Sequence, residues 1–176
     1  MKYSFLILSL IALFSCSDPK ADLIKEIDTL STVMKAEDFP SEENMNKIVG
    51  LYNLYLLTYP EDELALNYME LKAKYLSANN DYAGAIKAYD DIIAKFPEGN
   101  RKADALFMQA FIYENNMLDL GSAEAKYQSF IEQYPKHELV HDAQFAIENL
   151  SLSDEELFEK LMMMQNESLV IDSFIE

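Results

Sequence analysis

The segment NDYAGAIKAYDDIIAKFP (80–97) recurs in diverged form on both sides of itself in the chain. Its apolar residues follow helical spacing as far as Phe96, and the proline after them ends the helix. An aromatic residue followed by proline closes all three copies, at Pro60, Pro97 and Pro135. Similarity at a spacing of 37 to 38 residues indicates a helical repeat array, in which each unit buries its apolar face on the next.

The apolar spacing arranges the helices in pairs. We expect helices over 21–36, 41–58, 62–78 and 80–97, a third pair joined by a turn at 115–121, and a fourth unit from about residue 138. Ser41 is the expected N-cap of the second helix, and Ser153 with Glu156 forms a capping box for a last helix. The predicted fold is all-α, a solenoid of antiparallel helix pairs with about four units over residues 21–166.

Small residues mark the contact between the two helices of a pair. Alanine stands in mid-helix at Ala73 and Ala85 in the second pair, and at Ala110 and Ala123 in the third. Small side chains at a contact let two helices approach closely, so we expect these four alanines to be buried. The turn at 115–121 is one residue longer than its counterpart in the second pair, which accounts for the change in spacing from 37 to 38.

The first residues have the features of an export signal. A basic residue, Lys2, precedes an apolar run over 5–14, which is too short to span a bilayer and suits a secretory signal peptide. The run ends in Leu-Phe-Ser-Cys, which resembles the lipobox of bacterial lipoproteins. This resemblance implies removal of residues 1–15 and lipidation of Cys16, the only cysteine, with 16–20 as a tether. The alternative is a plain signal peptide in which the cysteine occurs by chance.

The charge balance excludes some partners. The chain carries 31 acidic against 14 basic residues, a formal net charge of −17. Such a surface repels phosphate backbones, so nucleic acid is not an expected partner. Many of the acids cluster where helices should begin, and there they complement the helix dipole. The apolar tail at 167–176 could dock on the array or on a partner, and the sequence does not decide which.

Three segments, NNDYAGAIKAYDDIIAKFP, ALFMQAFIYENN and SAEAKYQSFIEQYP, resemble the tetratricopeptide repeat. The likeness covers 62–135 best and departs from the family where Lys72-Ala73 replaces its usual Leu-Gly pair. It implies a non-catalytic scaffold that binds other proteins in a concave groove lined by the first helix of each pair. With the lipobox, the chain resembles envelope proteins such as the lipoprotein subunit of the outer-membrane barrel-assembly machine and the periplasmic protein of the Tol-Pal system. This implies a location in the bacterial envelope, on the periplasmic face of the outer membrane, and a role in outer-membrane assembly or maintenance.

Candidate partner-binding residues lie on these first helices. Phe107 and Phe111 are one helical turn apart in the third pair, and Phe145 repeats the Phe107 position in the fourth unit. If exposed, they would form an apolar strip suited to a helix or an extended peptide. The residues expected to flank this strip are Glu70, Lys74 and Glu114. The alternative is that the phenylalanines simply widen the core.

Residues 137–141 read His-Glu-Leu-Val-His, the H-E-x-x-H pattern of zinc peptidases. Under that alternative His137 and His141 bind zinc, Glu138 is the general base, and the third ligand comes from Glu155, Glu156 or Glu159. The pattern needs both histidines inside a helix, but a proline just before it places His137 at or outside the helix start. We therefore expect no metal, no cofactor and no catalytic residues.

Overall fold

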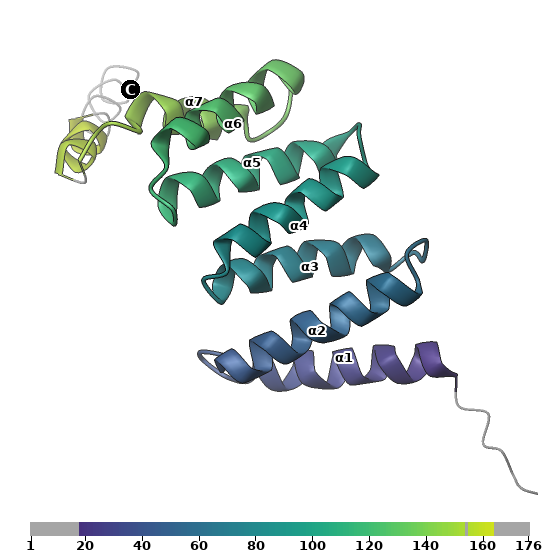
Figure 1. Cartoon of the computed structure of the whole chain (residues 1–176). Helices are drawn as coiled ribbons and strands as arrows, with labels where there is room; N and C mark the ends of the chain where they lie inside the picture. Colours follow the sequence, from purple (N-terminus) through teal and green to yellow (C-terminus); the bar gives the residue numbers. More distant parts are fainter. Residues whose placement is uncertain (1–17, 154, 164–176) are drawn as a thin grey trace, which may run out of the picture.

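The computed structural model describes residues 18–153 and 155–163. Over 18–153 the chain forms α1 (Pro19–Lys35), α2 (Glu42–Thr58), α3 (Ala65–Ala78), α4 (Tyr82–Lys95), α5 (Asn100–Asn115), α6 (Leu120–Gln133) and α7 (Val140–Asn149). Residues 155–163 are also helical. Consecutive helices run antiparallel and stack in chain order from α1 to α7 (Figure 1). The predicted all-α solenoid of about four units is confirmed. None of the described helices is both long and apolar enough to cross a membrane.

Side-chain caps set the helix starts. Ser41 accepts a hydrogen bond from the Asn44 N–H at 3.2 Å, so the predicted cap of α2 is confirmed. Ser153 and Glu156 form the predicted capping box, in which the Ser153 N–H donates to the Glu156 carboxylate at 2.8 Å. α1 begins earlier than expected, because Asp18 caps it by accepting from the Lys20 N–H.

The turns inside the second and third pairs differ in length, as predicted. Three residues separate α3 from α4, and four separate α5 from α6. Each turn holds one residue in the left-handed region, Asn80 with φ 62° and Leu118 with φ 53°. An aspartate then caps the following helix in both cases: Asp81 accepts from the Gly84 N–H, and Asp119 from the Ser122 N–H. The extra residue is therefore accommodated in the turn, and the caps of α4 and α6 are equivalent.

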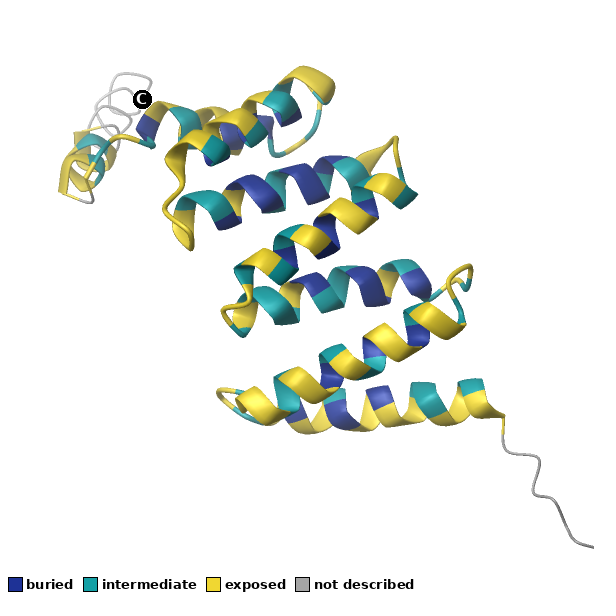
Figure 2. Cartoon of the chain, in the orientation of Figure 1, coloured by how far each residue is buried: buried dark blue, intermediate teal, exposed yellow. Residues whose placement is uncertain are grey.

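The core is divided into three clusters, and each joins one pair to the first helix of the next. The first contains residues of α1, α2 and α3, the second those of α3, α4 and α5, and the third those of α5, α6 and α7. The buried faces of successive helices point toward one another, and the exposed residues lie on the outside (Figure 2). Since every cluster needs the next pair, no pair is a complete folding unit by itself.

The four alanines at mid-helix are fully buried. Ala73, Ala85, Ala110 and Ala123 are each 0% exposed, as predicted. They lie where α3 packs on α4 and where α5 packs on α6. Their methyl groups leave no room for a longer side chain without separating the two helices of a pair.

A buried polar residue that the sequence did not predict connects three helices. The fully buried Gln109 of α5 donates to the Asp90 carboxylate of α4 at 2.7 Å and to the backbone oxygen of Ile86 at 3.0 Å. Its oxygen accepts from the Lys126 ammonium group of α6 at 2.7 Å. The nitrogen and the oxygen of the Gln109 amide therefore both have hydrogen-bond partners, so the side chain can be buried without an unpaired polar atom. The same bonds hold the second helix pair in place relative to the third.

Asp62 holds the turn between α2 and α3. Its carboxylate accepts from the Tyr55 hydroxyl at 2.6 Å, from the Leu64 N–H at 3.0 Å, and from the Lys20 ammonium group. The hydrogen bonds from Lys20 and Tyr55 lower the pKa of Asp62 to about 2. α3 starts at Ala65 rather than at residue 62, because Asp62 belongs to this turn and not to the helix.

Candidate functional site

A cavity of about 350 Å³ opens between the first helices of the second and third pairs. Most of its lining comes from α3 and α5, and α4 supplies the rest with one residue that precedes α7. The lining residues are Glu70, Lys74, Tyr89, Ile92, Arg101, Asp104, Ala105, Phe107, Met108 and Leu139. Apolar side chains predominate, and charged residues accompany them. We call this cavity the α3–α5 groove.

Both acidic residues that line the α3–α5 groove, Glu70 and Asp104, face basic side chains. Arg101 donates to Oε1 of Glu70 at 2.7 Å, which joins α5 to α3 across the groove. Oδ1 of Asp104 lies 3.4 Å from Nε2 of His137, whose side chain is nearly buried. The ion pairs of the described residues leave Lys74 unpaired, and its side chain is exposed. The groove is thus less acidic than the chain as a whole.

Three of the residues singled out in the sequence lie together in the α3–α5 groove: Glu70, Lys74 and Phe107. The sequence did not single out Arg101 or Met108. Helical spacing could have indicated both, because Arg101, Asp104 and Met108 follow one another at intervals of three to four residues and so lie on one face of α5.

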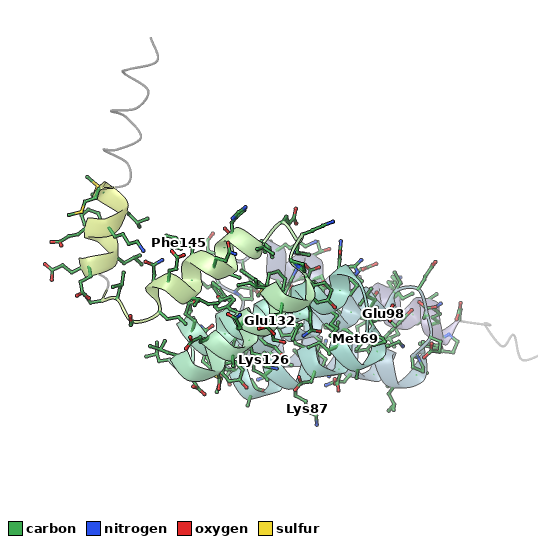
Figure 3. The ribbon with its side chains drawn as sticks, turned by 90° about the horizontal axis from the view of Figure 1, so that it is seen from above. Met69, Lys87, Glu98, Lys126, Glu132 and Phe145 are labelled. Carbon is green, nitrogen blue, oxygen red and sulfur yellow. The ribbon has the colours of Figure 1, made fainter. Side chains whose placement is uncertain are left out.

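Phe111 and Phe145 lie outside the lining of the groove. Phe111 is 43% exposed and follows Met108 by one turn on the same face of α5, so it extends the surface beyond the cavity. The ammonium group of Lys160 sits 5.9 Å from the ring centroid of Phe145, which gives that ring a neighbour in the last described helix. Figure 3 places Phe145 on the side of the array opposite to Lys87 of α4.

Glu114 and Phe107 have structural contacts. The Glu114 carboxylate accepts from the Tyr127 hydroxyl of α6 at 2.7 Å, so it faces the paired helix. Burial, together with the Glu114 carboxylate, raises the pKa of Tyr127. Phe107 packs edge-on against Tyr127 and Phe130, with ring centroids 5.4 and 5.6 Å away. Phe107 therefore packs in part against the core, as the alternative in which the phenylalanines widen the core predicts. The same residue also lines the α3–α5 groove.

His137 occupies a turn and repeats the geometry of Asp62. Its Nδ1 accepts from the Leu139 N–H at 3.3 Å, just as Asp62 accepts from the N–H of Leu64 two residues later. The ring packs edge-on against Phe130, at a centroid distance of 5.2 Å. The sequences YPEDEL (59–64) and YPKHEL (134–139) carry this likeness, so the first half of the H-E-x-x-H pattern belongs to a turn that repeats the one at 59–64.

The geometry that a zinc peptidase needs does not form at residues 137–141. α7 starts at Val140, so His137 and Glu138 precede the helix and only His141 lies in it. Of the three proposed third ligands, Glu156 has its carboxylate engaged in the capping box, and Glu155 and Glu159 are exposed. Over residues 18–153 and 155–163, no group of three or more His, Cys, Asp or Glu side chains is arranged to hold a metal ion.

The helices form antiparallel pairs that stack in a row, and the first helices of two pairs line a groove. This architecture is that of a helical-repeat protein. The family model of the tetratricopeptide repeat matches residues 63–99 and 104–137, which span α3 to α6. These two segments, 71 of the 176 residues, are therefore similar to the tetratricopeptide repeat. Repeats of this kind typically form non-enzymatic scaffolds that bind other proteins on an extended surface. A comparison with curated proteins finds no match to this chain.

Some residues with an expected role lie outside the described part of the chain. These are the signal peptide over 1–15, the lipidation site Cys16 and the tail over 167–176. Lipid anchoring and the fate of the tail therefore stay predictions from the sequence.

Proposed function

We propose that this protein is a lipid-anchored scaffold of the bacterial envelope that holds a protein partner in the α3–α5 groove. The observation that carries the proposal is the groove itself, an apolar cavity with charged side chains, formed by the first helices of two tetratricopeptide repeats. An acylated Cys16 would hold the array at the periplasmic face of the outer membrane, where the scaffold would serve outer-membrane assembly or maintenance.

The chemistry of the groove suits a polypeptide. Apolar walls give a partner side chain somewhere to be buried, and the cavity volume is at the small end of the range for ligand pockets. The Arg101–Glu70 ion pair holds two charged side chains in place before binding. Phe111 continues the apolar surface along α5, so a partner segment could lie along this helix and insert one side chain.

The net charge of the chain favours some protein partners over others. A chain at −17 attracts basic surfaces and repels acidic ones over a distance set by the ionic strength. We therefore expect the partner to present a basic surface, and we expect the association rate to fall as salt is added.

Replacing Phe111 with alanine is expected to weaken partner binding and to leave the fold intact. Because the residue is 43% exposed, loss of its ring should lower the stability by only about 1 kcal/mol, which is too little to unfold the protein. Loss of an aromatic anchor should lower partner affinity about tenfold. The measurement is the fraction of the chain found in formaldehyde-crosslinked complexes in intact cells, with the thermal midpoint of the purified variant recorded beside it.

Phe39→Ala is the matched control for Phe111→Ala. Phe39 is 92% exposed and lies between α1 and α2, away from the groove, so its loss should leave the complexes unchanged. Unfolding of the Phe111→Ala variant, or complexes as abundant as in the wild type, would contradict the proposal.

Replacing Cys16 with alanine is expected to abolish lipidation. In cells fed radiolabelled palmitate, the wild-type chain should carry the label and float with the outer-membrane fraction, because acyl chains anchor it there. The Cys16→Ala variant should lose the label and appear in the soluble periplasmic fraction. Ser17→Ala, which changes the neighbouring residue, should behave as the wild type. Equal labelling of both variants would show that Cys16 is not the anchor.

A further inference from the structure

Tyr89 lines the α3–α5 groove and carries a buried, unpartnered hydroxyl group. The residue is 4% exposed and lies on α4 between the two helices that form the groove. Among the residues that the structure describes, nothing donates to this buried oxygen or accepts from it. Buried polar groups in folded proteins are almost always hydrogen-bonded, so an unpaired hydroxyl beside a cavity points to a group that enters the cavity.

This hydroxyl keeps its proton at neutral pH, as an ordinary tyrosine does, and can therefore donate. Burial, and next the negative charge of Glu70, raise the pKa of Tyr89 further, to about 12. The hydroxyl of the neighbouring Tyr82, by contrast, donates to the Asn80 side chain at 2.6 Å. Tyr89 therefore offers a proton that no described acceptor takes up.

Glu70 offers the complementary function in the same cavity. Its Oε1 accepts from Arg101, whereas the hydrogen bonds among the described residues leave Oε2 without a donor. Among the residues that line the groove, Tyr89 thus carries an unused donor and Glu70 an unused acceptor. The apolar side chains of Ile92 and Met108 line the same space.

We propose that the α3–α5 groove takes the side chain of a partner glutamine, whose carbonyl oxygen accepts from Tyr89 and whose amide group donates to Glu70. The inference rests on the proposed function and specifies the side chain that the partner inserts. The two methylene groups of glutamine would pack against the apolar wall. The amide is neutral and satisfies both groups at once.

Other side chains fit the groove less well. A partner carboxylate could accept from Tyr89, but it would meet the negative charge of Glu70. An ammonium group could pair with Glu70 but offers no acceptor to Tyr89. An apolar side chain would bury the hydroxyl more deeply and leave it unpaired.

A double-mutant cycle tests this pairing. The full chain in detergent micelles is used to select binders from a phage-displayed library of random linear peptides. The selected peptides should share one glutamine next to apolar residues. Calorimetry then measures the affinity of one such peptide and of its Gln→Leu, Gln→Asn and Gln→Glu forms, for the wild type, Tyr89→Phe and Tyr82→Phe.

The expected result is a coupling between the glutamine and Tyr89. Tyr89→Phe should weaken the glutamine peptide about tenfold and leave the leucine peptide unchanged, because only the first uses the hydroxyl. Tyr82→Phe removes a hydroxyl from the same helix outside the cavity and should change neither affinity. The asparagine and glutamate peptides should bind more weakly than the glutamine peptide.

The outcomes separate this inference from the proposed function. Peptides that bind without a glutamine preference, or with no coupling to Tyr89, would overturn the inference and leave protein binding in place. Failure to select any peptide, with unchanged complexes for Phe111→Ala in cells, would overturn both. Tyr89→Phe should melt at or above the temperature of the wild type. A clear drop would mean that the hydroxyl is already satisfied in the free chain, which also contradicts the inference.

Discussion

Replacing Phe130 with alanine is expected to lower the free energy of unfolding by about 3–5 kcal/mol, the usual cost of removing a fully buried aromatic ring. Phe130 is 0% exposed and lies on α6 in the third core cluster. Its ring contacts Phe107 of α5 and His137 before α7, with centroids 5.6 and 5.2 Å away. The variant should therefore weaken both the third pair and its contact with the fourth unit. Urea denaturation followed by circular dichroism measures the change.

Phe39→Ala again provides the control, because it removes the same side chain from a position that is almost fully exposed. Its effect should stay within about 0.5 kcal/mol. A similar, small loss for both variants would mean that Phe130 is not part of a packed core, and the arrangement of α5, α6 and α7 would be wrong.

Replacing Ala123 with leucine is expected to destabilise the protein by about 1–3 kcal/mol, although leucine is a good helix former. Ala123 is fully buried on α6, where this helix packs on α5. A larger side chain has to separate the two helices or adopt a strained rotamer. The measurement is the thermal unfolding midpoint, which should fall by several degrees.

Ala125→Leu is the matched control for this variant. Ala125 lies two residues further along α6 and is exposed, so the same substitution adds a side chain in solvent and should leave the midpoint nearly unchanged. Equal midpoints for Ala123→Leu and the wild type would contradict the close packing of α5 on α6.

The sequence predicted the helices and their pairing because this information is local. Helical spacing, aromatic-proline stops and caps such as Ser41 are all read within a few residues. The register between repeats also revealed the buried alanines. The start of α3 was misplaced because Asp62 can begin a helix or hold a turn, and its contacts with Tyr55 and Lys20 decide for the turn.

The groove could be predicted only in part, because its geometry depends on contacts between distant residues. Arg101 meets Glu70 across 31 positions of sequence, and no local pattern reports such a pair. Glu114 looked like a groove residue from its place on α5, but its carboxylate faces Tyr127 of the paired helix. The unpaired hydroxyl of Tyr89 is likewise invisible in the sequence, where this residue reads as one core aromatic among several.

Site-specific photo-crosslinking in living cells tests the central claim, that a protein partner occupies the α3–α5 groove. A photoreactive phenylalanine analogue replaces Lys74, which lies in the groove, or Lys87, an exposed lysine of α4 that points away from the array (Figure 3). Both positions replace a lysine, so the change in charge is the same. We predict a discrete crosslinked protein from position 74 and none from position 87. Crosslinks to the same protein from position 87 alone, or from neither position, would contradict the account.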